Sequence, residues 1–104
     1  MSQHSLTVKQ IEAETKQIRM TLYAWGGVYF VQSSSGGPIK IGKSNNIHRR
    51  ISSLKSGSPV ELKLLRAIRT DDAGTLEREL HERFADKKLR GEWFNITVED
   101  IPKK

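Results

Sequence analysis

The stretch 27–50 constrains the fold more than any other part of this 104-residue sequence. Two short apolar runs, at 28–31 and 39–41, flank a cluster of serine, glycine and proline residues at 33–38. A basic segment that begins with potential helix caps follows the second run directly. Short apolar runs around turn-forming residues are typical of a β-hairpin, and a capped segment is typical of a helix. The sequence therefore predicts a hairpin that leads straight into a helix.

Side chains alternate between the two faces of a strand, so the hairpin also predicts which residues lie together. Tyr29 and Val31 share one face of the first strand, and Lys40 points away from its isoleucine neighbours on the second. We expect Tyr29 and Lys40 to lie on one face, next to a helix that carries Arg49 and Arg50.

The apolar spacing of the other segments completes a small α+β domain, within the broad α/β class. We expect a mainly antiparallel three-stranded sheet flanked by helices, with an added N-terminal helix. Beyond the hairpin we expect a helix at about 8–23, a helix capped by Ser44, Asn45 or Asn46, and a strand with one apolar face at 60–68. A helix at about 73–85, capped by Asp71 or Asp72, a short strand or extended segment at 92–96 and a brief final turn begun by Thr97 with Asp100 follow. Residues 1–26 would form a helix that packs on the domain or on a partner, and 27–104 the domain itself.

The composition excludes several classes of protein. The chain has no cysteine and only three histidines, which excludes zinc ribbons, thiol catalysis and disulfide scaffolds and disfavours a structural zinc site. No apolar run approaches the roughly 18 residues of a membrane span, and the first twenty residues lack the apolar core of a signal peptide. We therefore expect a cytoplasmic protein that does not engage a membrane.

The net charge of +6 is concentrated in one third of the chain. Residues 39–70 hold eight basic residues and a single acidic one, Glu61, whereas the rest of the chain is nearly balanced. A concentrated basic face suits binding to a phosphate backbone, although a solvated basic surface explains the same pattern. Besides Lys40 and Arg50, the basic residues of this segment are candidates for nucleic-acid binding: Lys43, Arg49, Lys55, Lys63, Arg66 and Arg69.

Five short elements, in this order and spacing, resemble a known family. They are GVY at 27–29, KIG at 40–42, Arg50, the helix pattern ExxLHxxF at 77–84 and GEWF at 91–94. Together they resemble the GIY-YIG nuclease superfamily, and in particular its short branch in phage and bacterial proteins. The resemblance covers about 27–96 and implies a metal-dependent DNA endonuclease.

The resemblance also implies a role for each matching residue. Tyr29 would activate or orient the attacking water, and the ammonium of Lys40 would favour the ionised phenol. Arg50 would hold the scissile phosphate with its guanidinium. Glu77 would be the single protein ligand of Mg²⁺ or Mn²⁺. His81 would contact phosphate or assist proton transfer, or else be a hydrogen-bonded structural histidine.

Other readings of the same residues stay open at this point. Tyr29 alone reads as a half-buried strand aromatic, and Glu77 alone as a surface partner of Arg78 or Arg83. For the whole chain, the first alternative is a DNA-binding module that cuts nothing. The second is a protein-interaction domain with a basic face, in which the N-terminal helix forms a homodimer or binds a partner protein.

Overall fold

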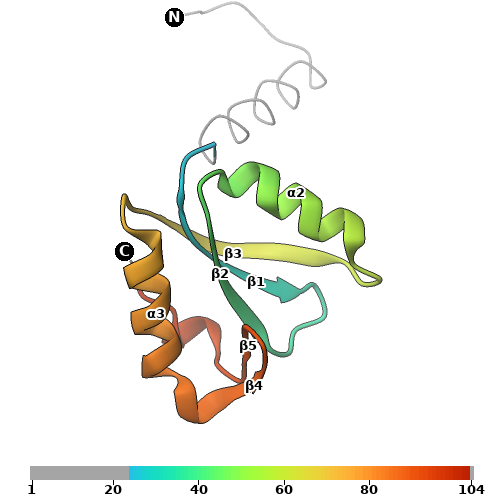
Figure 1. The fold of residues 1–104 in the computed structure, drawn as a ribbon. Coiled ribbons are helices and arrows are strands. Elements are labelled where there is room, and N and C mark those ends of the chain that lie inside the picture. The colour runs from blue at the N-terminus through green and yellow to red at the C-terminus, as the bar shows by residue number, and fades with distance from the viewer. Residues whose placement is uncertain (1–23, 104) are drawn as a thin grey trace, which may run out of the picture.

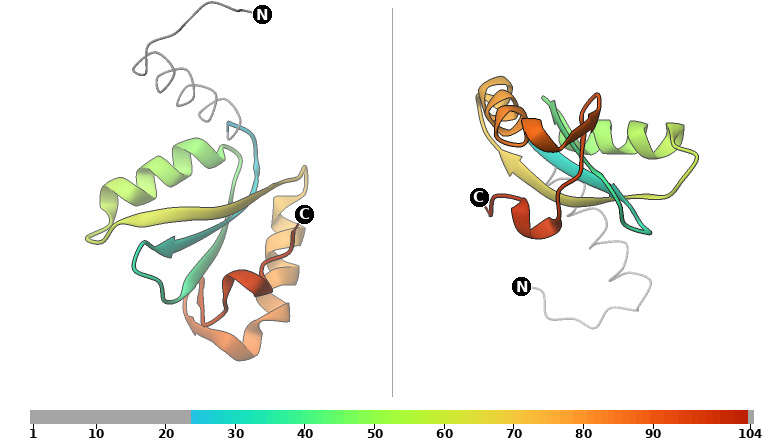
Figure 2. Two further views of the ribbon diagram at one scale, coloured as in Figure 1. Left: turned by 180° about the vertical axis from the view of Figure 1, so that it is seen from behind. Right: turned by 90° about the horizontal axis from the view of Figure 1, so that it is seen from below.

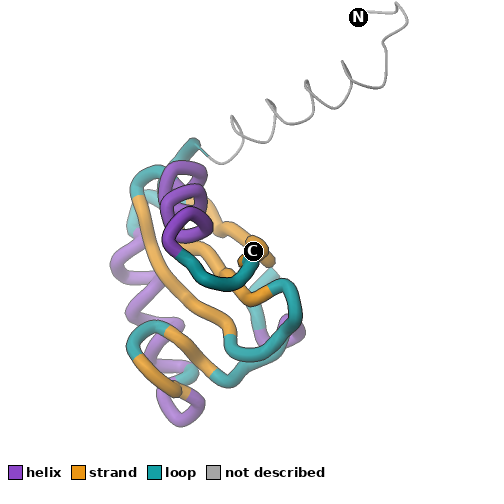
Figure 3. Tube along the Cα trace, turned by 90° about the vertical axis from the view of Figure 1, so that its right-hand side faces the viewer, coloured by secondary structure: helices purple, strands orange, loops and turns teal. Residues whose placement is uncertain are grey.

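The structure is a computed structural model, and it describes residues 24–103 (Figure 1). Five strands form one sheet in the order β3-β1-β2-β5-β4, and every pairing in it is antiparallel. The long strands bend and twist along their length (Figure 3). The elements are β1 (Gly27–Ser33), β2 (Ile39–Ser44), α2 (Ile47–Gly57), β3 (Leu62–Arg69), α3 (Ala73–Arg83), η1 (Ala85–Lys87), β4 (Lys88–Arg90), β5 (Trp93–Phe94) and η2 (Val98–Asp100).

The hairpin prediction is confirmed. β1 and β2 pair along their whole length, with Val31 opposite Lys40. Two adjacent glycines in the loop, Gly36 and Gly37, have φ angles of 98° and 100°, which L-residues with side chains rarely adopt. Tyr29 and Val31 belong to one buried cluster, and the isoleucines of β2 to the other, so Lys40 does share a face with Tyr29.

The prediction of three strands is wrong, because β4 and β5 extend the sheet to five. β5 pairs with β2, and β4 pairs with β5. β4 has three residues, all exposed, so it carries no apolar alternation that a sequence reading could detect. The turn between these strands depends on Gly91, whose φ of 57° lies in the left-handed region.

Each of the two α-helices begins after one of its candidate caps, Asn46 for α2 and Asp72 for α3. The Asn46 side chain accepts a hydrogen bond from the backbone N–H of Arg49 at 3.0 Å, and Asp72 does the same for Thr75 at 3.3 Å. The predicted final turn is also present, because Thr97 and Asp100 form a reciprocal capping box around η2.

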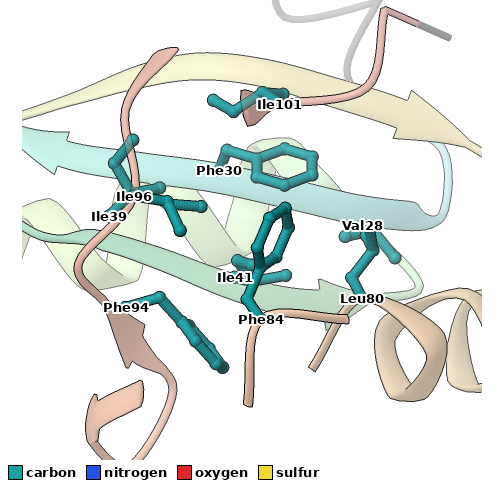
Figure 4. Packing of buried hydrophobic residues seen from close by; sticks show 9 residues of the cluster. All are labelled: Val28, Phe30, Ile39, Ile41, Leu80, Phe84, Phe94, Ile96 and Ile101. Atoms are coloured by element: carbon teal, nitrogen blue, oxygen red, sulfur yellow. The ribbon is translucent and has the colours of Figure 1, made fainter. Parts of the chain in front are cut away.

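The helices cover opposite faces of the sheet, and each covers its own core (Figure 2). On the α3 face the core holds nine buried side chains, drawn in Figure 4: Val28, Phe30, Ile39, Ile41, Leu80, Phe84, Phe94, Ile96 and Ile101. On the α2 face the buried residues are Tyr29, Val31, Ile47, Ile51 and Leu62. β1 is central, and its first five residues are buried on both faces.

The third strand differs from the prediction of one apolar face. A register shift between Phe30 and Val31 interrupts the pairing of β1 with β3, so Leu64 packs on the α2 side and Ile68 on the α3 side. Val60 precedes the strand and is 54% exposed. β3 also approaches β1 closely, because a Cβ added at Gly27 would lie 1.9 Å from the Ile68 carbonyl oxygen.

The predicted N-terminal helix, and with it the proposed dimer or partner contact, lies outside the described residues. Within 24–103, no helix is both long enough and apolar enough to cross a membrane.

Candidate active site

One part of the candidate site is built where β1 and β2 pair. Tyr29 lies directly opposite Gly42. A Cβ added at Gly42 would lie 2.3 Å from the Tyr29 hydroxyl oxygen and 2.4 Å from the ring carbon Cζ. Both distances are far below van der Waals contact, so only glycine leaves room for the ring over β2. The glycine of the KIG element therefore fixes where the phenol lies.

Arg50 reaches this phenol from α2. Its neighbour Ile51 is buried against the sheet, which holds the helix down at this point. The Arg50 Nε donates a hydrogen bond to the Tyr29 hydroxyl oxygen over 3.4 Å. This hydrogen bond is the largest of the effects that raise the pKa of Arg50, and the charge of Glu92 adds to it. The guanidinium is therefore a permanent cation, held over a tyrosine that is 1% exposed.

Lys40 is held on the same face by the β2–β5 edge. Its ammonium forms an ion pair with the Glu92 Oε1 at 2.9 Å and lies 5.7 Å from the centre of the Trp93 ring. The Lys40 side chain is 14% exposed, whereas that of Glu92 is 40% exposed. Lys40 is thus fixed by one carboxylate and one aromatic face.

Glu77 occupies the side of the site formed by α3. Its Oε2 is buried and has no hydrogen-bond partner in the described part of the chain. Burial is the main cause that raises the Glu77 pKa, and the neighbouring Glu92 carboxylate raises it further. His81 and Lys43 act in the opposite direction. Neither Arg78 nor Arg83 forms an ion pair with Glu77 among the described residues. The alternative interpretation of Glu77 as a surface ion-pair partner of these arginines is therefore not supported.

His81 lies one helical turn after Glu77 and contacts the edge of β2. Its Nε2 is 3.0 Å from the Ile41 carbonyl oxygen, and its ring centre is 4.9 Å from that of Phe94. A carbonyl oxygen can only accept, so Nε2 carries the hydrogen. This nitrogen is thereby occupied, and Nδ1 is the ring atom left for any substrate.

Glu92 joins the two parts of the site. Its carboxylate pairs with Lys40 and interacts electrostatically with both Arg50 and Glu77. No direct hydrogen bond or ion pair connects Glu77 to Tyr29 or Arg50 in the part of the chain that the structure describes. From here on, the candidate site means six side chains: Tyr29, Lys40, Arg50, Glu77, His81 and Glu92.

Sequence reasoning missed Glu92, although the GEWF segment that contains it was singled out. A glutamate in a short polar turn gives no periodic signal that would place it in a site. The turn at Gly91 and the pairing of β5 with β2 bring it there, since the Glu92 carbonyl oxygen accepts from the Ile41 N–H at 3.0 Å.

Lys43 is the one predicted DNA-binding residue whose charge is shown acting on Glu77. It also lines a cleft of about 440 Å³ at the end of the sheet where β1 begins and β2 and β3 end. This volume lies in the range typical of sites for small ligands. The other lining residues are Gly26, Gly27, Ser44, Asn45, Thr70, Asp71 and Ala73.

The other five predicted DNA-binding residues are spread over two elements. Arg49 and Lys55 are exposed on α2, and Lys63 and Arg69 are exposed near opposite ends of β3. The Arg69 guanidinium lies 5.9 Å from the centre of the Trp25 ring. Arg66, also in β3, is partly buried, and its Nε has no hydrogen-bond partner in the described residues. These five cations lie on α2 and β3, and none of them is among the charges that shift the Glu77 pKa.

The donor set around Glu77 fits a hard, hydrated cation. Across residues 24–103 no group of three or more histidine, aspartate, glutamate or cysteine side chains is arranged to hold a metal ion. Mg²⁺ keeps several of its waters, and one or two carboxylates with substrate phosphates usually complete its shell. A buried carboxylate oxygen without a partner, next to a second carboxylate, suits such an ion.

Comparison with known proteins gives one match. The family model of the T5orf172 domain matches residues 26–103. This family is associated with nuclease-like and DNA-binding proteins, which is consistent with a DNA-related role. Neither a curated protein nor a solved structure matches the chain. The assignment to the GIY-YIG superfamily is therefore wrong, because the matching family is a different one.

Proposed function

The chain belongs to the T5orf172 domain family, and we propose that it is a metal-dependent endonuclease that hydrolyses phosphodiester bonds of DNA. The observation that carries the proposal is the buried, unpartnered Oε2 of Glu77 beside Glu92. Burial of an unsatisfied carboxylate oxygen is unfavourable in a folded chain unless a ligand completes it. Two cations, Lys40 and Arg50, interact with the Glu92 carboxylate. A divalent cation and a phosphodiester together would satisfy both groups of charges.

The reaction is an in-line displacement at phosphorus. The oxygen of a water forms the new bond, the bond to the leaving oxygen breaks, one proton leaves the water and one reaches the leaving oxygen. Glu77 would hold the Mg²⁺ or Mn²⁺, which supplies Lewis-acid stabilisation of the phosphate charge. The chain's own residues hold the phosphate and move the protons.

Arg50 is the residue best suited to hold the scissile phosphate. Its guanidinium can donate two parallel hydrogen bonds to phosphate oxygens, and charge that develops on these oxygens strengthens them. Tyr29 sets its position by accepting a hydrogen bond from Nε. The phenol keeps its own O–H, which would donate a hydrogen bond to the attacking water. Lys40 provides the second cation of the phosphate site.

His81 contributes near Glu77 rather than at the phenol. Its charge favours the ionised form of that carboxylate when the ring is protonated. Proton transfer to the leaving oxygen by His81 would use Nδ1, since Nε2 donates to the Ile41 carbonyl.

DNA would run from the candidate site toward the cleft that Lys43 lines. Lys43 would hold a phosphate next to the scissile one, while the cations of α2 and β3 would add affinity without reading sequence. Such contacts release counterions, so binding would weaken steeply as salt rises.

Cleavage of supercoiled plasmid and of labelled oligonucleotides, with Mg²⁺ or Mn²⁺, tests the proposal. We expect the wild type to nick DNA, and Glu77→Ala and Arg50→Ala to reduce the rate by about a hundredfold or more. Glu79→Gln and Arg83→Ala are matched controls, because both residues are exposed on α3. They should cut at the wild-type rate.

Two results would overturn the proposal. A wild type that binds duplex DNA but cuts no substrate with either metal would be a catalytically silent binding module. A Glu77→Ala variant that cuts as fast as the wild type would show that Glu77 does not hold the metal.

A further inference from the structure

Glu92 has more charged neighbours than is usual for a partly exposed glutamate. It is a 40% exposed glutamate, yet its carboxylate faces an ammonium at 2.9 Å and acts on a guanidinium and on a second carboxylate. The Lys40 partner is only 14% exposed, so the ion pair can add to stability as well as hold the ammonium in place. A test of its role therefore has to measure stability and turnover separately.

The backbone around Glu92 is fixed on both sides. Its carbonyl oxygen accepts from the Ile41 N–H, and the next residue, Trp93, pairs with Lys40 across β2 and β5. Gly91, with its φ of 57°, turns the chain into this position from β4. The carboxylate is therefore held at one point of the β2 edge, where Lys40 is within its reach.

Without this carboxylate, the Lys40 side chain could adopt several conformations. A lysine side chain has four rotatable bonds and a strongly hydrated ammonium, so an unpaired one spends most of its time in water. Here the side chain is only 14% exposed and its ammonium lies 5.7 Å from the Trp93 ring centre. The ion pair and the indole face together restrict the ammonium to the side of the sheet that carries Tyr29 and Arg50.

We propose that Glu92 is a positioning residue that holds the Lys40 ammonium in place for the phosphate. This inference rests on the proposed nuclease function. It assigns to Glu92 an effect on turnover that is exerted through Lys40. It also predicts that the negative charge of Glu92 affects DNA affinity and the cleavage rate in different ways.

On binding, the charge of Glu92 acts against DNA. A carboxylate beside Arg50 and Lys40 repels a phosphate, so Glu92→Gln should leave the affinity for DNA unchanged or make it tighter. On reaction, the same substitution releases Lys40 from its fixed position. Small displacements of a charged group in a phosphoryl-transfer site lower the rate strongly. We therefore expect kcat to fall by about tenfold or more while the Kd for DNA does not rise.

A double-mutant cycle tests whether Glu92 affects turnover through Lys40. If Glu92 acts through Lys40, then Lys40→Met removes most of what Glu92 contributes, and the double variant should be no slower than Lys40→Met alone. Glu92→Asp keeps the charge but shortens the side chain, so it should recover part of the lost kcat. Glu79→Gln removes an exposed charge on α3 and should leave kcat unchanged. Urea unfolding of each variant separates a loss of folded protein from a loss of turnover.

A second readout does not depend on cleavage. We expect the paired Lys40 ammonium of the wild type to give a slowly exchanging NMR signal, which should disappear in Glu92→Gln and persist in Glu79→Gln. A wild type that cuts no DNA would refute the nuclease proposal, and the NMR signal would then decide whether Glu92 holds Lys40. The inference itself is overturned if Glu92→Gln cleaves at the wild-type rate, if its effect adds fully to that of Lys40→Met, or if the Lys40 signal is unchanged.

Discussion

The two sides of the candidate site differ in how completely the chain itself provides partners for their polar atoms. On the α2 side, the Tyr29 ring fills the space over Gly42 and its hydroxyl accepts a hydrogen bond from Arg50. On the α3 side, Glu77 keeps a buried oxygen without a partner in the described residues, next to another carboxylate. The first side is complete as folded, whereas on the second a buried carboxylate oxygen lacks a partner among the described residues.

This contrast indicates which part of the site packing builds and which part a ligand completes. A side chain held by close contacts and a hydrogen bond is already in its working position, so it needs nothing from solution. A partly buried carboxylate beside a like charge is costly unless a cation joins it. Glu92 lies between the sides and interacts with a cation on one and with Glu77 on the other.

Glu77→Gln should have the largest effect, and it should lower the cleavage rate without lowering stability. The substitution keeps the shape of the side chain and removes its charge, so metal-dependent cleavage should fall by about a thousandfold. Folding should be unaffected or improved, because the ionised carboxylate is unfavourable where it lies. Cleavage kinetics and urea unfolding measured on the same preparation test this. A large loss of stability would mean that the Glu77 side, like the Tyr29 side, is held by its own contacts.

Gly42→Ala should have the next largest effect, and it should act on folding as well. The new methyl group collides with the Tyr29 ring, and overpacking of this kind destabilises by about 1–3 kcal/mol. Gly57→Ala is the matched control, since a Cβ there has open space around it and the residue ends α2. Urea denaturation should show a clear loss for the first variant and none for the second. Equal midpoints would mean that the ring can move aside without loss.

The pH dependence of stability should show the smallest effect. The native pKa of Glu77 is raised above its ordinary 4.5, mainly by burial, so between the two values the native state binds more protons than the unfolded state. Stability from this residue therefore falls as pH rises through that window, and the penalty is fully present above the native pKa. Without divalent metal, the difference in unfolding free energy between Glu77→Gln and the wild type should widen as pH rises from 4.5. A difference that stays constant or narrows would contradict the raised pKa.

The parts of the fold that were predictable are those in which a local rule fixes the geometry. Alternating apolar residues predicted the hairpin, and small sets of candidate caps, which included Asn46 and Asp72, predicted the starts of both helices to within two residues. β5 lies within the segment 92–96 that was expected as a short strand or extended segment, whereas β4 was not predictable, because its three exposed residues carry no period. The register shift at Phe30 was equally invisible, since it depends on how β1 and β3 meet.

The candidate site was predictable as a set of residues but not as a network. The resemblance selected Tyr29, Arg50 and Glu77, although the family it named was wrong. Charge counting predicted a basic face, and the structure places those cations on β2, on α2 and along β3. Glu92 joins the network only through the pairing of β5 with β2, which no local sequence pattern predicts.

Direct measurement of Mn²⁺ binding, by calorimetry and electron paramagnetic resonance, gives the sharpest test of whether a cation completes the Glu77 side. Wild type and Glu77→Gln would be titrated in parallel at neutral pH, with Glu79→Gln as the charge control. We predict one site in the wild type and in Glu79→Gln, and loss of that site in Glu77→Gln. Equal binding by all three proteins, or binding by none, would contradict it.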